Sequence, residues 1–362
     1  MFGLNNALAK LDHVQLRVLS SDAAGPSLSC RLAVSVTEPT RYPQGYDVYF
    51  CRRVLGSEIA PRLLSRLLGL VRWADVIHLT AAYSFSTLPT LLVCRLLGKP
   101  VVWSPRGALL ATHEWQGARR RSLKLVWDQL CNAIVTGGRC VLHVTSEQER
   151  MASLARIPHV SARVIRNGVD FPIVLPQREW CPGGRMRLIF IGRLDPQKGI
   201  ENLLNALGLL RGEELSLEIC GTGEATYVQE LKALVKQLRL DKRVEFVGHV
   251  NAENRFAAFM RADLCVTPSH KENFAMVVAE ALAHGVPVIA STGTPWRGVI
   301  ERGCGAWVDN SPETLASAIH GMRYRPLAEF GQRGRCWMAS DFSWEVVAEE
   351  MYELYKSICA TT

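Results

Sequence analysis

Short apolar runs alternate with longer amphipathic segments along the N-terminal half of the chain. Runs of this length are typical of buried parallel strands, and the segments between them have helical spacing. The pattern predicts strands at 14–19, 75–79, 101–104 and 140–145, and helices at 60–72, 86–97 and 117–135.

The alternation is clearer in the C-terminal half, after a Pro- and Gly-containing stretch at 178–184 that is typical of a linker. It predicts strands at 188–191, 215–220, 244–247, 264–267 and 286–290, and helices near 200–210, 224–239, 253–260 and 274–284. Strand–helix alternation builds a parallel sheet covered on both faces. We therefore expect two Rossmann-like α/β domains facing a cleft, at 1–177 and 183–340.

The composition fits two such domains and indicates the cellular compartment in which the protein is expected. The chain has 362 residues, 48% of them hydrophobic, and no apolar run long enough to span a membrane. The N-terminus does not resemble a signal peptide. The eleven cysteines include no Cys-x-x-Cys pair, which predicts buried free thiols in a reducing, cytoplasmic compartment and no zinc site.

The net charge of +8 and pI of about 9.0 indicate anionic partners. Phosphates, nucleic acid and an acidic membrane face all fit that charge. Composition does not choose among them.

Two segments that each join a strand to a helix carry candidate chemistry. Residues 191–199 place Arg193 and Lys198 at the carboxyl edge of a sheet, where ligands of α/β folds bind. Two cations beside a helix N-terminus could hold a diphosphate without a metal, although a solvated turn has the same pattern.

The second segment, 268–274, leads into a predicted helix. Glu272 lies before that helix and Glu280 lies two turns inside it, so both carboxylates could face one side. They could bind sugar or ribose hydroxyls, and the N–H groups near Phe274 and Ala275 suit a phosphate. Helix capping by Asn273 and Glu272 is the alternative.

Two turns add further candidate ligand-binding positions to these two segments. Gly221 and Gly223 follow a strand, but the third glycine of a dinucleotide fingerprint is missing, so a close-approach turn is the better interpretation. Residues 167–170 form a turn expected to face the cleft.

Together these segments resemble family 4 of the retaining glycosyltransferases (glycosyl transferases group 1), which have the GT-B fold. The resemblance covers 165–310 and rests on 192–199, the glycine turn, Val247 to His249, and the spacing from Ser269 to Ala281. Residues 341–362 resemble the helix with which that family crosses back to its N-terminal domain.

The resemblance implies a role for each matching residue. Arg193 and Lys198 would hold the donor diphosphate, Glu272 would contact the donor sugar, and Glu280 the ribose. No metal or cofactor would be required, because these cations stabilise the leaving group during front-face attack. The donor site would also include Gly192, Gly221, Gly223, Val247, His249, Ser269, Asn273, Phe274 and Ala275.

The sequence departs from the family in its N-terminal half and at one later position. Ala275 replaces a usual glycine. The first strand of the N-terminal domain and its Gly-Gly loop are missing ahead of Met1. Arg106 stands where the family has a histidine, and could bind phosphate on the acceptor side or anchor its loop.

The implied function is transfer of a hexosyl residue from a UDP- or GDP-sugar to a glycan acceptor, expected to be lipid-linked, in bacterial surface polysaccharide synthesis (O-antigen, capsule or exopolysaccharide). Nucleic acid is not an expected partner. One alternative is a catalytically weak subunit that binds glycan or a partner protein, which the missing loop motivates. A nucleotide-sugar epimerase of the same fold fits the Arg193, Lys198, Glu272 and Glu280 set less well.

A basic helix in the N-terminal half indicates a membrane surface. Trp115, Arg119 to Arg121, Lys124 and Trp127 flank three apolar positions, Leu123, Val126 and Leu130. The pattern is typical of an interfacial helix at the inner face of the plasma membrane. It equally fits an amphipathic helix whose apolar side packs on the core.

Overall fold

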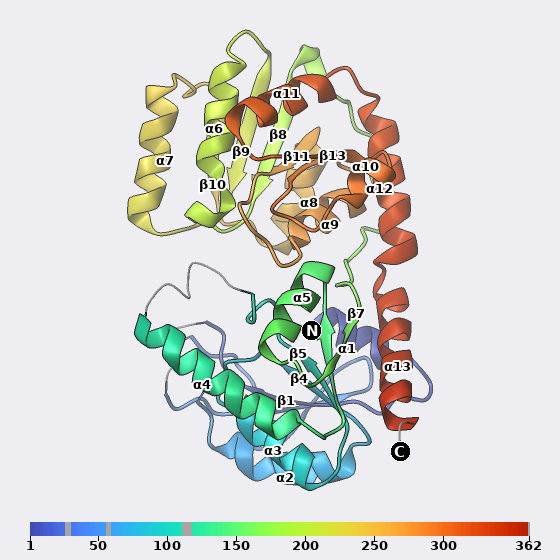
Figure 1. Cartoon of the computed structure of the whole chain (residues 1–362). Helices are drawn as coiled ribbons and strands as arrows, with labels where there is room; N and C mark the ends of the chain where they lie inside the picture. The colour runs from blue at the N-terminus through green and yellow to red at the C-terminus, as the bar shows by residue number, and fades with distance from the viewer. Residues whose placement is uncertain (26–29, 56–58, 111–117, 361–362) are drawn as a thin grey trace. The chain divides into compact units, whose positions relative to one another are not determined.

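A computed structural model describes residues 1–25, 30–55, 59–110 and 118–360, and the chain divides into two compact units (Figure 1). Unit 1 comprises Met1–Arg166 together with Trp344–Thr362, and unit 2 comprises Asn167–Ser343. The division therefore lies ahead of the Pro- and Gly-containing stretch at 178–184, which falls inside unit 2.

Unit 1 is an α/β unit with two small sheets. One is a parallel sheet of order β4-β5-β6-β7, and the other has order β1-β3-β2 with β2 antiparallel. Among the described residues no strand joins β1 to β4. The elements are α1 (Phe2–Leu8), β1 (Arg17–Ser21), β2 (Thr40–Arg41), β3 (Asp47–Cys51), α2 (Arg62–Trp73), β4 (Ile77–Thr80), α3 (Thr87–Leu96), β5 (Val101–Ser104), α4 (Ala118–Val135), β6 (Cys140–Val144), α5 (Glu147–Arg156), β7 (Ser161–Val164) and α13 (Trp344–Ala360).

Alternating side chains of β5 separate the two faces of the larger sheet. Val101 and Trp103 pack on one face with apolar residues of α2, α3 and α4. Val102 packs on the other face with residues of α1 and α13. Helix α13, although last in the sequence, is thus part of the unit 1 core, and α1 packs against it (Figure 1).

A chain of polar side chains lies buried beneath α13. His143 Nε2 is 3.0 Å from the Ile165 carbonyl oxygen, which can only accept, so Nε2 carries the proton. His143 Nδ1 then accepts from the Ser104 hydroxyl at 2.6 Å, and Ser104 accepts from His78 Nε2 at 2.6 Å. His78 Nδ1 finally accepts from the Tyr355 hydroxyl of α13, also at 2.6 Å. Every donor finds an acceptor only while both histidines are neutral.

Unit 2 is a six-stranded parallel sheet of order β10-β9-β8-β11-β12-β13 with helices on both faces. Residues of α6, α7 and α11 pack on one face, and residues of α8, α9, α10 and α12 on the other. The elements are β8 (Met186–Ile191), α6 (Ile200–Leu209), β9 (Leu215–Cys220), α7 (Ala225–Gln237), β10 (Val244–Gly248), α8 (Ala252–Arg261), β11 (Leu264–Thr267), α9 (Met276–Ala283), β12 (Val288–Ser291), α10 (Gly298–Glu301), β13 (Gly305–Val308), α11 (Pro312–Met322) and α12 (Leu327–Asp341), with short 3-10 turns at Pro182–Gly184 and Pro196–Lys198.

The predicted strands of the C-terminal half are confirmed within a few residues, and the doubly covered parallel sheet is confirmed as well. The predicted strand at 14–19 is shifted, because β1 begins at Arg17 while Val14 packs with α1 and α13. Seven of the eleven cysteines are buried thiols, whereas Cys30 and Cys336 are exposed.

The buried histidines predict a loss of stability in acid. Burial lowers the pKa of His143 to about 3 and that of His78 well below its usual range. The unfolded chain therefore binds more protons than the folded chain below pH about 6.5. Because of His143 alone, the free energy of unfolding should be about 2 kcal/mol lower at pH 5 than at pH 7. Urea unfolding at both values measures this.

The control for that measurement is the exposed His159. We expect His143→Gln to flatten the pH dependence between pH 7 and pH 5, and His159→Gln to leave it unchanged. An equal slope for wild type and His143→Gln would show that His143 is not held neutral by the fold.

Candidate functional site

The loops that follow β8 and β11 meet at the carboxyl edge of the unit 2 sheet. Gly199 has a left-handed φ of 64°, and a Cβ atom there would lie 2.3 Å from the Pro268 carbonyl oxygen. His270 N donates to the Gln197 carbonyl at 2.9 Å. Only glycine permits this approach, and it brings the two predicted segments together.

Lys198 and Glu272 form an ion pair where these loops meet. The Ser269 hydroxyl donates to the same carboxylate oxygen at 2.9 Å, and Ser269 is itself fully buried. Lys198 belongs to the short turn that begins at Asp195, whose carboxylate accepts from Gln197 N at 3.0 Å. Lys198, Ser269 and Glu272 are therefore held as one cluster with opposite charges in contact.

Arg193 lies apart from this cluster. Its side chain is 66% exposed, and its nearest carboxylate is that of Asp195 at 3.9 Å. Both predicted cations thus have a carboxylate partner: Lys198 in a close, half-buried pair, and Arg193 in a longer and largely exposed one.

Glu280 forms a different ion pair, with Arg255 of α8 at 2.5 Å. Burial raises the pKa of the Glu280 carboxyl, Arg255 opposes that rise, and the negative charge of Asp170 adds to it. Asp170 belongs to the turn expected at 167–170, which therefore lies near Glu280. The carboxylate is held in a half-buried position with a cation beside it.

The predicted helix at 274–284 begins later than expected. Ala275 has a left-handed φ of 60° and α9 starts at Met276, so Glu272 lies in a loop. Glu272 therefore precedes the helix, as expected, but helical spacing does not relate it to Glu280, because the left-handed residue interrupts the helical path. The capping alternative is wrong, since Ala275 occupies the N-cap position and no side-chain cap is formed.

Phe274 and Ala275 turn their side chains into the core. The Phe274 ring packs 5.2 Å from the Trp296 ring, and Trp296 Nε1 donates to the Phe274 carbonyl. Ala275 is 7% exposed. These residues can therefore offer a ligand only their backbone groups, and Asn273 precedes them as a half-buried residue.

The glycine turn after β9 supports a neighbouring loop. A Cβ at Gly221 would lie 1.8 Å from the Gly192 carbonyl oxygen, and one at Gly223 would lie 2.0 Å from that of Leu194. Both glycines are required by this close approach, whatever else they contact. The Gly248 carbonyl accepts from Gly221 N at 2.7 Å, and its neighbours Val247 and His249 are exposed beside the turn.

Three residues of this edge were missed by the sequence analysis. Gly293 accepts a hydrogen bond from Glu272 N at 2.9 Å, and a Cβ at Gly293 would lie 2.3 Å from the His270 carbonyl. Asn310 Nδ2 donates to the Pro268 carbonyl at 3.0 Å. A glycine three residues after the predicted strand at 286–290 was a recognisable signal, whereas nothing local marks Asn310 or Arg255.

Arg106 belongs to unit 1, in the loop after β5. Its φ of 54° is left-handed, and burial lowers the pKa of its guanidinium. The next residue, Gly107, donates its N–H to Glu149 at 2.5 Å, and Glu149 also accepts from Thr145 N. Glu149 thus anchors the loop, and Arg106 Nη2 contacts Met1 Sδ at 2.7 Å.

Potential metal ligands do not gather in the part of the chain that the structure describes. No group of three or more His, Cys, Asp or Glu side chains lies in a suitable arrangement there.

Comparisons with known proteins identify the fold and give a family match for residues 177–322. Residues 177–322 match the family described as glycosyl transferases group 1. Glycogen synthase of Mycobacterium tuberculosis H37Rv is 31% identical over 201 residues, which are 53% of this chain and 47% of the relative. The chain thus spans about half the length of that relative.

Two solved structures resemble the chain more completely. Sucrose-phosphate synthase from Thermosynechococcus elongatus has a TM-score of 0.72 at 22% identity, covering 99% of this chain and 92% of its own. Anabaena HepE, in complex with UDP and glucose, has a TM-score of 0.68 at 18% identity, covering 87% of each chain. The chain therefore has the GT-B fold, and its residues 177–322 match the glycosyl transferases group 1.

Proposed function

We propose that this protein is a retaining glycosyltransferase that moves a hexosyl residue from a nucleotide-sugar to a glycan acceptor. The observation that carries the proposal is the Lys198–Glu272 pair, supported by Ser269, at the carboxyl edge of the group 1 domain. A cation and a carboxylate in contact at this edge supply one group for a diphosphate and one for sugar hydroxyls.

Donor binding exchanges the partners of this pair. Without donor, the Lys198 charge is balanced by Glu272. A diphosphate carries more negative charge than one carboxylate, so it takes Lys198 and releases Glu272 to the hydroxyls of the donor sugar. Lys198, joined by the exposed Arg193, then stabilises charge on the departing diphosphate. Two cations replace the metal, so no metal or other cofactor is needed.

Nucleoside recognition falls to the neighbouring loops. Glu280, held by Arg255, accepts hydrogen bonds from the ribose hydroxyls. Val247 and His249 are exposed beside the glycine turn and contact the base. The UDP and glucose bound to HepE favour a UDP-sugar as the first donor to test, with a GDP-sugar as the second.

The acceptor is a lipid-linked glycan of bacterial surface polysaccharide synthesis, used at the inner membrane face. Helix α4 supports this part of the proposal, because Leu123, Val126 and Leu130 are 66%, 54% and 49% exposed. These three residues do not pack on the core, although Trp127, Cys131 and Val135 of the same helix do. Trp115 lies outside the described residues, as do the side chains of Arg119 and Arg120. No helix in the described ranges is long and apolar enough to cross a membrane.

A panel of UDP- and GDP-sugars tests the proposal, with donor hydrolysis and donor binding measured in parallel and with EDTA in one arm. We expect one donor to be hydrolysed at a rate that EDTA does not change. Binding without hydrolysis would instead indicate the catalytically weak subunit, and a strict requirement for added magnesium would overturn the metal-free mechanism.

Lys198→Ala should lower kcat by about 100- to 1,000-fold, the usual effect of removing one group that stabilises a developing negative charge. Arg193→Ala should act in the same direction but less, because Arg193 is largely exposed. Arg185→Ala is the matched control, since Arg185 is an exposed arginine of the same unit. Activity of both site variants within threefold of the control would remove the diphosphate assignment, where threefold is about 0.6 kcal/mol.

Glu272→Gln and Glu280→Gln should separate turnover from donor binding. Glu272 touches the sugar being transferred, so Glu272→Gln should lower kcat at saturating donor. Glu280 anchors the ribose, so Glu280→Gln should mainly raise the KM for donor. If Glu280→Gln gave the larger loss of kcat, the two roles would be reversed.

Helix α4 should hold the protein on anionic liposomes at low salt and release it at about 0.5 M salt, since each cation near such a surface contributes about 1 kcal/mol and salt screens it. Leu123→Ser with Val126→Ser should weaken co-sedimentation, and Arg121→Gln should do so at low salt. Leu209→Ser, which alters an exposed leucine of unit 2, is the control. Equal binding to neutral liposomes would argue against the electrostatic part of this assignment.

A further inference from the structure

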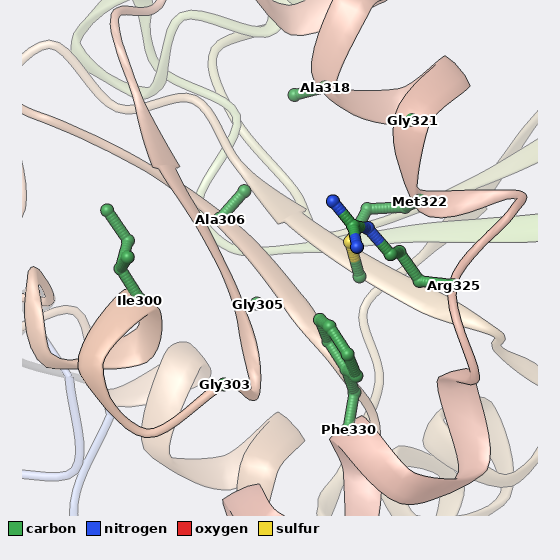
Figure 2. A pocket seen from close by; sticks show the side chains of 9 residues that line it. All are labelled: Ile300, Gly303, Gly305, Ala306, Ala318, Gly321, Met322, Arg325 and Phe330. Carbon is green, nitrogen blue, oxygen red and sulfur yellow. The ribbon is translucent and has the colours of Figure 1, made fainter.

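A hollow lies at the edge of the unit 2 sheet, apart from the candidate donor site. Its volume is about 330 Å³, and none of its lining residues belongs to the donor set. It opens beside the first half of β13, at the amino end of a parallel sheet whose carboxyl end carries Lys198 and Glu272. The lining residues are mostly small or apolar: Ile300, Gly303, Gly305, Ala306, Ala318, Gly321, Met322, Arg325 and Phe330 (Figure 2).

The hollow straddles an edge strand with unused backbone groups. Strand β13 pairs only with β12, through Ala306 and Val308. In a parallel ladder the alternate residues, Gly305 and Trp307, turn their N–H and C=O groups outward. Within the described ranges, no backbone hydrogen bond joins these groups to another residue. They can pair with an added strand.

The two sides of the edge offer places for alternate side chains. Figure 2 shows Ile300 on one side of the segment that carries Gly305 and Ala306, with Met322 and Phe330 on the other. Side chains of an added strand alternate between the two faces of the sheet. An apolar side chain on the Met322 side would cover an otherwise open apolar wall.

The charge of the side chains around the hollow indicates which kind of partner strand would bind there. Arg325 is exposed at the hollow and forms no ion pair among the described residues, unlike Arg323, which is paired with Glu213. Arg333 lies close by, donating to the Gly303 carbonyl at 2.7 Å, but its charge is paired with Glu329 at 3.5 Å. A second copy of this chain, pairing β13 with β13, would bring its own Arg325 to this edge, where like charges repel. An acidic partner strand is favoured instead.

We propose that the edge of β13 binds an extended segment of a partner protein that carries an apolar and an acidic side chain. The segment pairs with Gly305 and Trp307 as a seventh strand, its apolar side chain enters the hollow, and its carboxylate pairs with Arg325. The binding does not depend on the proposed transferase activity.

A defined peptide tests the proposal on the full chain. The probe is a short fluorescein-labelled peptide of alternating threonine and leucine with one terminal aspartate, followed by fluorescence anisotropy. We expect saturable binding with a Kd at or below about 100 μM, and binding at least about tenfold weaker when lysine replaces the aspartate. Arg325→Glu should reverse that preference. No saturable binding of either peptide up to about 1 mM would overturn the proposal.

A glycine pair supplies the matched variants. A Cβ at Gly321, which lines the hollow, would meet no heavy atom within 4 Å, so we expect Gly321→Leu to place its side chain at the hollow. Gly69 of α2 is equally open and lies in unit 1. Gly321→Leu should weaken peptide binding at least about tenfold, and Gly69→Leu should not change it.

Two further results would overturn strand addition. The first is equal binding of a peptide with N-methylated backbone, which cannot pair with the edge and so would bind through side chains alone. The second is dimerisation of the protein without peptide that Gly321→Leu abolishes, which would assign the edge to a second copy.

Discussion

The carboxyl edge of unit 2 depends on how closely four loops approach one another, those that follow β8, β9, β11 and β12. Gly199 faces the Pro268 carbonyl, Gly293 faces the His270 carbonyl, and Gly221 faces the Gly192 carbonyl, each at a distance that a Cβ atom could not share. These contacts bring residues far apart in the sequence to one edge. The Lys198–Glu272 pair is a consequence of that approach, because its two residues come from different loops.

The same constraint explains which predictions from the sequence succeeded. The strands of unit 2 were predictable because each is buried on both faces and therefore reads as a continuous apolar run. Lys198, Ser269 and Glu272 were predictable as a group because all lie directly after such strands. The strand β13 was missed, since it has only four residues and begins with a glycine.

The sequence alone could not predict which side chains from distant elements would interact in the fold. Arg255 and Glu280 belong to different helices, and no local pattern connects them. The chain Tyr355–His78–Ser104–His143 joins three strands to the last helix, so each residue taken alone reads as an ordinary polar side chain. The apolar positions of α4 were ambiguous for a different reason. The same amphipathic pattern is found in a helix that packs on the core and in one that binds a surface, and only the observed exposure of the side chains distinguishes the two.

Ala275 shows how a local rule is broken where the candidate site requires it. A left-handed conformation costs a non-glycine residue about 1 to 2 kcal/mol. The surrounding packing offsets this, because Phe274 is fixed between the Trp296 and Phe342 rings and Trp296 holds its carbonyl. The left-handed residue ends the loop that carries Glu272 and delays the start of α9 until Met276. Had the helix begun earlier, Glu272 would lie on the helix and could not remain in the loop that places it against Lys198, so the strain at Ala275 is part of what places the carboxylate.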